Sequence, residues 1–291
     1  MSERFELPEN RKSTPYFIAP AGWDSTQPNL FTPDSAYDAS WVVLLIGSGE
    51  KHSPVYGRLD SGLFRCSLDR QTVDITPRVA DFVRYGATHG WRVILSFPSD
   101  TDGERFVRRS LEQTPDGPVV RETDPRWVVH STTLSAWESI EKDSCLKCAR
   151  CLQSEGVEVN AVGLDDFREP SDFADYVVLA PDYAISPEHV VASHAKGSVF
   201  TDENVPYVPG VRLYFDAYRI ITDGLAVRDG MHALKVRDRL PIDPYLRAAV
   251  SAADVDPEGR TSSWTPASFL KAANALFHER YADAHGEAGK P

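Results

Sequence analysis

Residues 127–146 read WVVHSTTLSAWESIEKDSCL and join a strand pattern directly to a helix pattern. The first three residues are typical strand formers, and apolar residues then recur at three-residue steps, as on one face of a helix. A threonine at the junction, either Thr132 or Thr133, suits the N-cap of that helix. His130 is not needed for a cap, so we consider it a candidate site residue at the end of a buried strand.

The composition is that of a globular protein, with 291 residues of which 42% are hydrophobic and 25% are charged. The formal net charge of −12 argues against a non-specific nucleic-acid binder, which needs a basic surface. No apolar run is long enough for a transmembrane helix, and the N-terminus lacks a signal-peptide pattern. We therefore expect a cytoplasmic protein with reduced cysteines and no membrane partner.

Strand and helix patterns alternate on the N-terminal side of this stretch. The alternation predicts an α/β fold with a layered sheet covered by helices, Rossmann-like in the N-terminal half. In such folds the sites gather at the C-terminal ends of the strands, where His130 is expected to lie. The predicted strands span residues 40–50, 91–97 and 127–130, and the predicted helices span 77–90, 99–113 and 133–142.

Further elements are predicted on the C-terminal side. Asp229-Gly230 is a hairpin dipeptide and places two short strands within residues 224–241. An apolar stripe along 265–284 predicts a helix that docks on the body of the protein. The remaining predicted strands span 157–164, 175–180 and 210–220, and a helix spans 186–197.

The segment GSGEKH, residues 47–52, follows the first buried strand. Glycines there allow the backbone to approach a phosphate, which Lys51 would neutralise, while Ser48 would act as a donor or nucleophile. His52 is a further candidate for substrate binding. A plain turn explains these residues equally well, because neither the dinucleotide-binding nor the P-loop glycine spacing is present.

Basic residues are concentrated on the predicted hairpin, although the chain is acidic. Alternate residues of a strand share a face, so Lys235, Arg237 and Arg239 are expected to line one positive face, near Arg228 and His232. Such a face suits a phosphate-bearing substrate. A solvated strand is an equally good interpretation.

Three cysteines, Cys145, Cys148 and Cys151, recur at three-residue steps in CLKCARC. Thiolates at this spacing bind zinc, but a closed site normally shows a second pair of ligands, and the sequence has none. Small buried cysteines are the better interpretation. We therefore expect these thiols to be reduced and free of metal.

The motif His130-Ser131-Thr132, within VVHSTTLSAWESI, resembles the opening of the ADP-ribosyltransferase fold of RNA 2′-phosphotransferases. In that family a strand carries a His-Gly-Thr motif and is followed by a helix. The resemblance covers residues 127–241 and continues, in the family's order, through YVVLA (176–180), SHAKG (193–197), VRLYFDA (211–217) and DGLAVRDGMHALKVRDRLP (223–241).

The resemblance implies that NAD is the cofactor and that ADP-ribose is transferred to an acceptor phosphate, for which RNA such as tRNA is the implied partner. It places NAD on the segment of His130, Ser131 and Thr132. Arg228 lies within one position of a family arginine that holds phosphate.

The residues suggest further roles in such a transfer. His232 and Lys235 would bind the diphosphate together with Arg228, and Ser48 completes the set of catalytic candidates with His130 and Arg228. The bond cleavage creates an oxocarbenium-like centre, which needs a carboxylate nearby. Asp216 and Glu188 are the candidates for it.

Two other functions are compatible with the sequence. A single Rossmann-like sheet from residue 41 to about residue 215 would resemble class I aminoacyl-tRNA synthetases and the cyclodipeptide synthases derived from them, with Ser48 as a nucleophile or positioning residue. The third possibility is a non-catalytic interaction protein whose acidic surface binds a basic partner.

These patterns divide the chain into four segments. We predict an irregular arm at 1–40, an α/β unit at 41–118, a transferase unit at 119–245, and a C-terminal helix and tail at 246–291.

Overall fold

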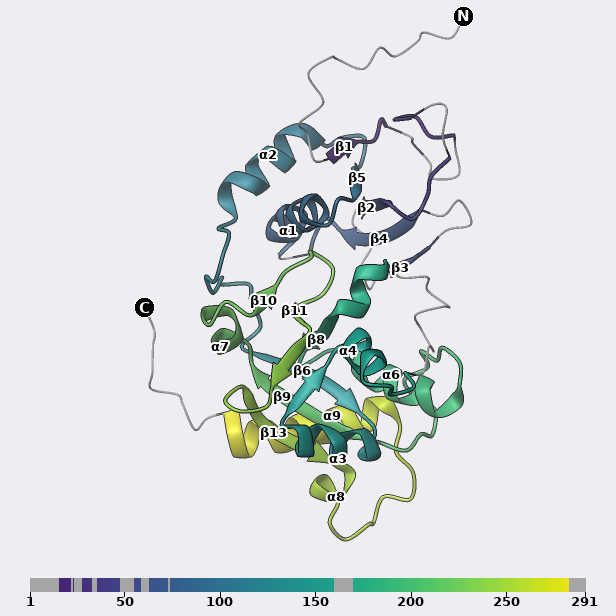
Figure 1. Cartoon of the computed structure of the whole chain (residues 1–291), viewed down its shortest axis with the longest axis vertical. Coiled ribbons are helices and arrows are strands. Elements are labelled where there is room, and N and C mark those ends of the chain that lie inside the picture. Colours follow the sequence, from purple (N-terminus) through teal and green to yellow (C-terminus); the bar gives the residue numbers. More distant parts are fainter. Residues whose placement is uncertain are drawn as a thin grey trace, which may run out of the picture. The chain divides into compact units, whose positions relative to one another are not determined.

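The structure is a computed structural model that describes residues 16–21, 23, 28–32, 36–47, 55–58, 63–72, 74–159 and 170–282. The chain forms two compact units (Figure 1). The first comprises Met1–Pro115 and Asp229–Met231, and the second comprises Asp116–Arg228 and His232–Pro291. The predicted boundary after residue 118 lies close to this division.

The first unit contains a five-stranded sheet in the order β1-β5-β2-β4-β3. Every neighbouring pair is parallel except β3 with β4, which is antiparallel. The predicted α/β class and the Rossmann-like alternation of the N-terminal half are confirmed. The elements are β1 (Tyr16–Ile18), β2 (Trp41–Gly47), β3 (Val55–Arg58), β4 (Phe64–Asp69), α1 (Ile75–Thr88), β5 (Arg92–Ser96) and α2 (Gly103–Gln113).

Individual residues account for the start of α2 and for the close packing of α1. Asp102 caps α2 by accepting a hydrogen bond from the backbone N–H of Arg105. Gly86 lies inside α1, and a Cβ atom there would be 2.2 Å from Cγ2 of Val93. The glycine therefore allows α1 to pack closely on β5.

The irregular arm predicted for residues 1–40 is wrong in its described part. Tyr16–Ile18 form the edge strand β1, which pairs with β5. Trp23 and Tyr37 are buried and form an aromatic cluster with Trp41. An irregular arm was predicted because its apolar residues show no period. In the structure several of them nevertheless pack against residues of the sheet.

The second unit contains a six-stranded sheet in the order β10-β11-β8-β6-β9-β13, and all its pairs are antiparallel. One Rossmann-like sheet running from residue 41 to about 215 is therefore wrong, because β2 and β9 belong to different sheets. A short buried strand has the same apolar pattern in either kind of sheet. The strands are β6 (Trp127–Thr132), β8 (Tyr176–Pro181), β9 (Val211–Asp216), β10 (Ala226–Val227), β11 (Leu234–Arg237) and β13 (Leu246–Ser251).

Helices and a small ribbon complete the second unit. Strand β7 (Cys145–Lys147) pairs with β12 (Arg239–Pro241) in a two-stranded sheet. The predicted strand at 157–164 lies mostly outside the described residues, and residues 157–159 are not in a strand. The helices are α3 (Leu134–Asp143), α4 (Ala149–Ser154), η2 (Ser171–Asp175), α6 (Ser186–Lys196), α7 (Ala217–Thr222), α8 (Ala252–Val255), α9 (Pro266–Phe277) and η3 (His278–Ala282).

Strand β6 contributes to two hydrophobic cores because successive side chains point to opposite faces of the sheet. Trp127 and Val129 pack with Phe269 and Phe277 of α9. Val128 belongs to the core on the other side, together with Ile220 of α7. In the part of the chain that the structure describes, we find no helix with the length and apolar character needed to cross a membrane.

Candidate functional site

The candidate site lies where the two central strands of the second unit separate. Strand β6 pairs with β9 along its whole length, from Trp127 to Thr132. Its pairing with β8 covers only Val128 and Val129. The imidazole of His130 lies just beyond this short ladder, and its Nδ1 atom is 3.2 Å from the carbonyl oxygen of Val178 in β8.

This contact defines the chemical state of His130. A carbonyl oxygen accepts hydrogen bonds and donates none, so the proton of the neutral ring is on Nδ1 and Nε2 is an acceptor. Burial lowers the pKa of His130 from its ordinary value of 6.5, and the imidazole of His194 on α6 lowers it further, against the opposing effect of the Val178 carbonyl. The ring is therefore neutral at pH 7, and Nε2 can accept a hydrogen bond from a ligand hydroxyl.

The junction between β6 and α3 is fixed by two local features. Of the two threonines that the sequence offered as N-cap, Thr133 is the one used, and its hydroxyl accepts a hydrogen bond of 3.2 Å from the N–H of Ala136. Gly210 approaches so closely that a Cβ atom there would lie 1.8 Å from the carbonyl oxygen of Thr132. Thr132 is half-buried at this junction, immediately after the separated part of β6.

Ser131, by contrast, belongs to a buried polar network. Its hydroxyl donates to Glu188 Oε1 at 2.6 Å, and Arg212 donates to the same oxygen at 2.8 Å. Tyr207 donates to the other oxygen of Glu188 at 2.7 Å. The side chains of Glu188 and Arg212 are fully buried. Ser131 thus anchors α6 to β6, and its predicted role in substrate binding stays a prediction.

Arg228 is also engaged by the protein. Its guanidinium donates to Asp124 Oδ2 at 2.6 Å and to the carbonyl oxygens of Val119 and Gly117 at 3.0 and 3.4 Å. The side chains of Arg228 and Asp124 are only 10% and 9% exposed. These contacts hold the chain segment before β6, and the predicted role of Arg228 in binding phosphate stays a prediction.

The predicted positive face of Lys235, Arg237 and Arg239 is wrong. Lys235 is fully buried, and its ammonium lies 4.1 Å from the ring centroid of Phe173. Arg237 is exposed at the end of β11, whereas Arg239 belongs to β12. The alternation ends between the two arginines, because Asp238, with a positive φ of 58°, separates β11 from β12, and Arg239 pairs with Lys147 of β7.

Lys235 and His232 nevertheless lie in one cluster. The ring of His232 is 5.4 Å from that of Phe173, which also contacts Lys235. Lys235 is the cross-strand partner of Val178, whose carbonyl accepts from His130. His130 and Lys235 therefore lie on strands to either side of β8, a backbone separation of about 10 Å, given the usual strand spacing.

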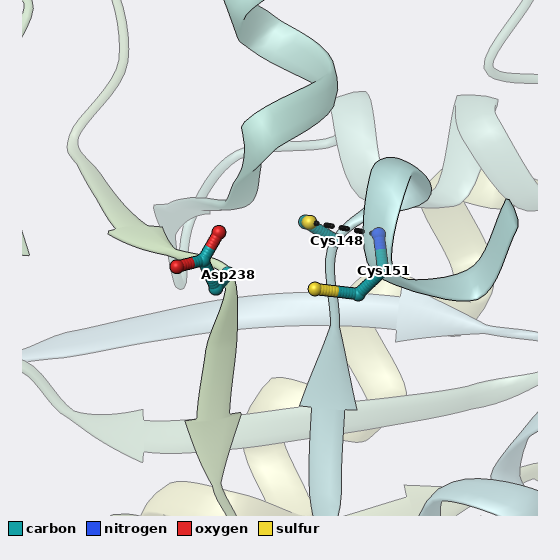
Figure 2. Close-up of side chains that lie close together, drawn as sticks. All are labelled: Cys148, Cys151 and Asp238. Carbon is teal, nitrogen blue, oxygen red and sulfur yellow. Dashed lines mark hydrogen bonds between the residues drawn. The ribbon is translucent and has the colours of Figure 1, made fainter. Parts of the chain in front are cut away.

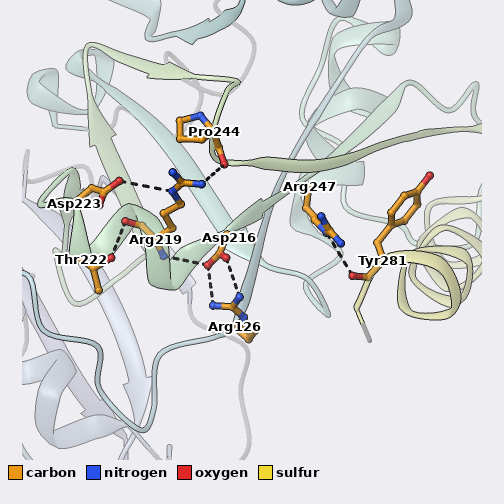
Figure 3. A network of polar contacts seen from close by, with 8 residues as sticks. All are labelled: Arg126, Asp216, Arg219, Thr222, Asp223, Pro244, Arg247 and Tyr281. Atoms are coloured by element: carbon orange, nitrogen blue, oxygen red, sulfur yellow. Dashed lines mark hydrogen bonds and ion pairs between the residues drawn. The ribbon is translucent and has the colours of Figure 1, made fainter. Parts of the chain in front are cut away.

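Both carboxylates proposed for charge stabilisation are occupied. Glu188 is bound in the Ser131 and Arg212 network. Asp216 makes two hydrogen bonds with Arg126, of 2.9 and 2.8 Å, and caps α7 by accepting from the N–H of Arg219 (Figure 3). Both acids therefore stabilise the fold of the second unit.

The candidates of the first unit, Ser48, Lys51 and His52, lie outside the described residues. The structure thus brings His232 and Lys235 together, and strand β8 separates them from His130 and Thr132. Arg228 is bound to Asp124 instead. His194 and Arg212 were not predicted from the sequence. Arg212 had a usable signal, since it is a charged residue at a buried position of an apolar strand.

Comparison of the chain with protein-family models, with curated proteins and with solved structures finds no match. The resemblance to the RNA 2′-phosphotransferases therefore depends on the short motifs quoted above.

Proposed function

We propose that the second unit is a group-transfer domain that binds a nucleotide donor where β6 and β8 separate, with NAD as the favoured donor. The contact between Nδ1 of His130 and the carbonyl oxygen of Val178 is the observation that carries this proposal. A neutral imidazole with its Nδ1 proton bound to Val178 offers Nε2 as a fixed acceptor, which suits a ribose hydroxyl.

The reaction would transfer ADP-ribose. The bond between C1′ of the ribose and the nicotinamide nitrogen breaks, and its electron pair leaves with nicotinamide. An oxygen of the acceptor then forms the new bond to C1′. His130 would orient the ribose, and orientation of this kind is a major source of rate acceleration.

The test is to titrate the full-length chain with NAD by calorimetry and to assay nicotinamide release in the presence of RNA, protein and small-molecule acceptors. His130→Gln should weaken NAD binding about tenfold, the equivalent of about 1.4 kcal/mol and of one hydrogen bond. The matched control is His278→Gln, because His278 is in η3 and pairs with Asp182. The control should bind NAD like the unmodified protein.

Absence of both NAD binding and nicotinamide release would refute the proposal. Turnover of aminoacyl-tRNA would instead support a synthetase-like activity, even though the single-sheet architecture expected for it is absent from the described residues. If neither substrate is used, an interaction protein becomes the better hypothesis.

A further inference from the structure

The fold brings two cysteines of the CLKCARC segment next to an acidic residue far along the chain. Cys148 lies between β7 and α4, and Cys151 lies in the first turn of α4. The backbone N–H of Cys148 donates to the carbonyl oxygen of Asp238 at 2.8 Å, so the β7–β12 ribbon itself aligns the two segments. The four cysteines of the chain are all free.

The side chains of these three residues converge. One ligand atom from each of Cys148, Cys151 and Asp238 lies within 4.8 Å of the other two (Figure 2). A tetrahedral zinc ion, with Zn–S bonds of about 2.3 Å and Zn–O bonds of about 2.0–2.2 Å, requires separations of about 3.5–3.8 Å between its ligand atoms. Small side-chain movements would therefore complete the geometry.

The local backbone supports the same arrangement. The N–H of Cys151 donates to the sulfur of Cys148 at 3.3 Å, which fixes the direction of that sulfur. Asp238 has a φ of 58°, in the left-handed region that aspartate adopts more readily than most residues other than glycine, and its carboxylate lies close to the two sulfurs.

The charged residues around the cluster also favour the binding of a divalent cation. Two thiolates and one carboxylate would leave a divalent cation with one excess negative charge. Arg237 lies 4.0 Å from the carboxylate of Asp238, and the side chain of Arg239 lies beside Cys151. These two cations offset that excess, and pairing of this kind is what a partly buried anionic centre requires.

We propose that Cys148, Cys151 and Asp238 form a zinc site that fastens α4 to the turn between β11 and β12. Three protein ligands leave the fourth position to water, since the side chain of Asp238 is 63% exposed. This replaces the expectation of metal-free cysteines. The spacing predicted no metal because the third ligand is 87 positions beyond Cys151 along the chain.

The test uses the full-length chain, purified under reducing conditions without a metal-affinity step. Elemental analysis should find about one zinc per chain, as the three-ligand site predicts. Replacement of the zinc by cobalt should give sulfur-to-metal charge-transfer absorption and the visible bands of a tetrahedral ion. Zinc should also raise the melting temperature, because it binds the folded state.

Cys151→Ser and Asp238→Ala should each weaken zinc binding by at least about 100-fold, more than the loss of an outer-shell partner does. They should also abolish the stabilisation by zinc. Cys145→Ser is the matched control, because it changes a thiol of the same segment outside the proposed ligand set, and it should retain zinc.

Three results would overturn the proposal. The first is reduced protein that binds neither zinc nor cobalt. The second is a Cys145→Ser variant that loses zinc as completely as Cys151→Ser. The third is a disulfide between Cys148 and Cys151 that persists in the reduced preparation and excludes metal. NAD binding is measured separately, so failure of the zinc site leaves the proposed function untouched.

Discussion

The Nδ1 atom of His130 lies 3.2 Å from the carbonyl oxygen of Val178, at the point where β6 and β8 stop pairing. A side-chain donor thus satisfies a carbonyl group of β8 beyond the short ladder. The hydrogen bond to Val178 orients the ring of His130, and it lies where the ladder between β6 and β8 has ended. A substitution at His130 should therefore affect both the local structure and any ligand bound there.

The first prediction concerns the protonation of His130. Since burial lowers its pKa below 6.5, the ring should remain neutral below the pH at which an ordinary histidine is half protonated. Nitrogen chemical shifts measured by NMR should show the Nδ1-protonated tautomer, with His130→Gln used to assign the signal. NAD affinity should be constant near pH 7 and fall as the pH drops through the pKa of His130. A ring that is charged at pH 7 would contradict this prediction.

The second prediction also follows from lowered histidine pKa values. Burial lowers the pKa values of His130, His189 and His194 in the folded state, so the unfolded chain binds more protons below about pH 6.5. The free energy of unfolding should therefore decrease as the pH falls from about 6.5 toward the folded-state pKa values. Urea unfolding between pH 5 and 7.5 measures this slope, and a variant with glutamine at all three positions should show a smaller slope.

Much of the architecture was predictable because local signals agreed with the tertiary structure. The apolar run of β2 and the capping threonine before α3 are signals of this kind, and both elements lie where the sequence placed them. The division into two sheets was not predictable, because strand direction depends on partners far along the chain. The same limit applies to the site. His130 was proposed because the sequence placed it at the end of its strand, whereas β6 continues to Thr132. Its bond to Val178 and the proximity of Asp238 to Cys148 exist only in the fold.

The third prediction concerns the buried ion pair of Glu188 and Arg212. Glu188→Gln keeps the shape of the side chain but leaves a fully buried arginine without its counter-charge. Breaking a buried pair in this way costs about 3–5 kcal/mol of unfolding free energy. The control is Glu258→Gln, which removes the charge of an exposed pair with Arg260 and should cost less than about 1 kcal/mol. Equal effects of the two substitutions would be inconsistent with a structural role of the buried pair.

The fourth prediction concerns Gly210. A Cβ atom at this position would lie 1.8 Å from the carbonyl oxygen of Thr132, and backbone cannot rotate away as a flexible side chain can. Gly210→Ala should lower the unfolding free energy by about 1–3 kcal/mol, as overpacking does. It should also weaken NAD binding, because the turn after His130 must move. Gly47→Ala is the control, since its nearest contact is an ordinary 3.5 Å. Unchanged stability and NAD binding in Gly210→Ala would show that the turn tolerates the displacement.

The last prediction separates two roles of Arg228. If its guanidinium mainly holds the segment before β6, Arg228→Ala and Asp124→Ala should each destabilise the protein by about 3–5 kcal/mol, because each leaves one buried charge unpaired. The double variant should cost less than the sum of the two, with a coupling energy of about 0.5–3 kcal/mol. Urea unfolding of the four proteins provides this cycle.

NAD titration of the same variants, under conditions where each is folded, distinguishes this role from phosphate binding. We expect the affinity to stay within about twofold of the unmodified protein, because Asp124 and two carbonyl oxygens already occupy Arg228. A phosphate-binding arginine would behave differently. Its removal would reduce NAD affinity or the rate by about 100-fold, as loss of one preorganised donor does. Asp124→Ala would then free the guanidinium and strengthen NAD binding.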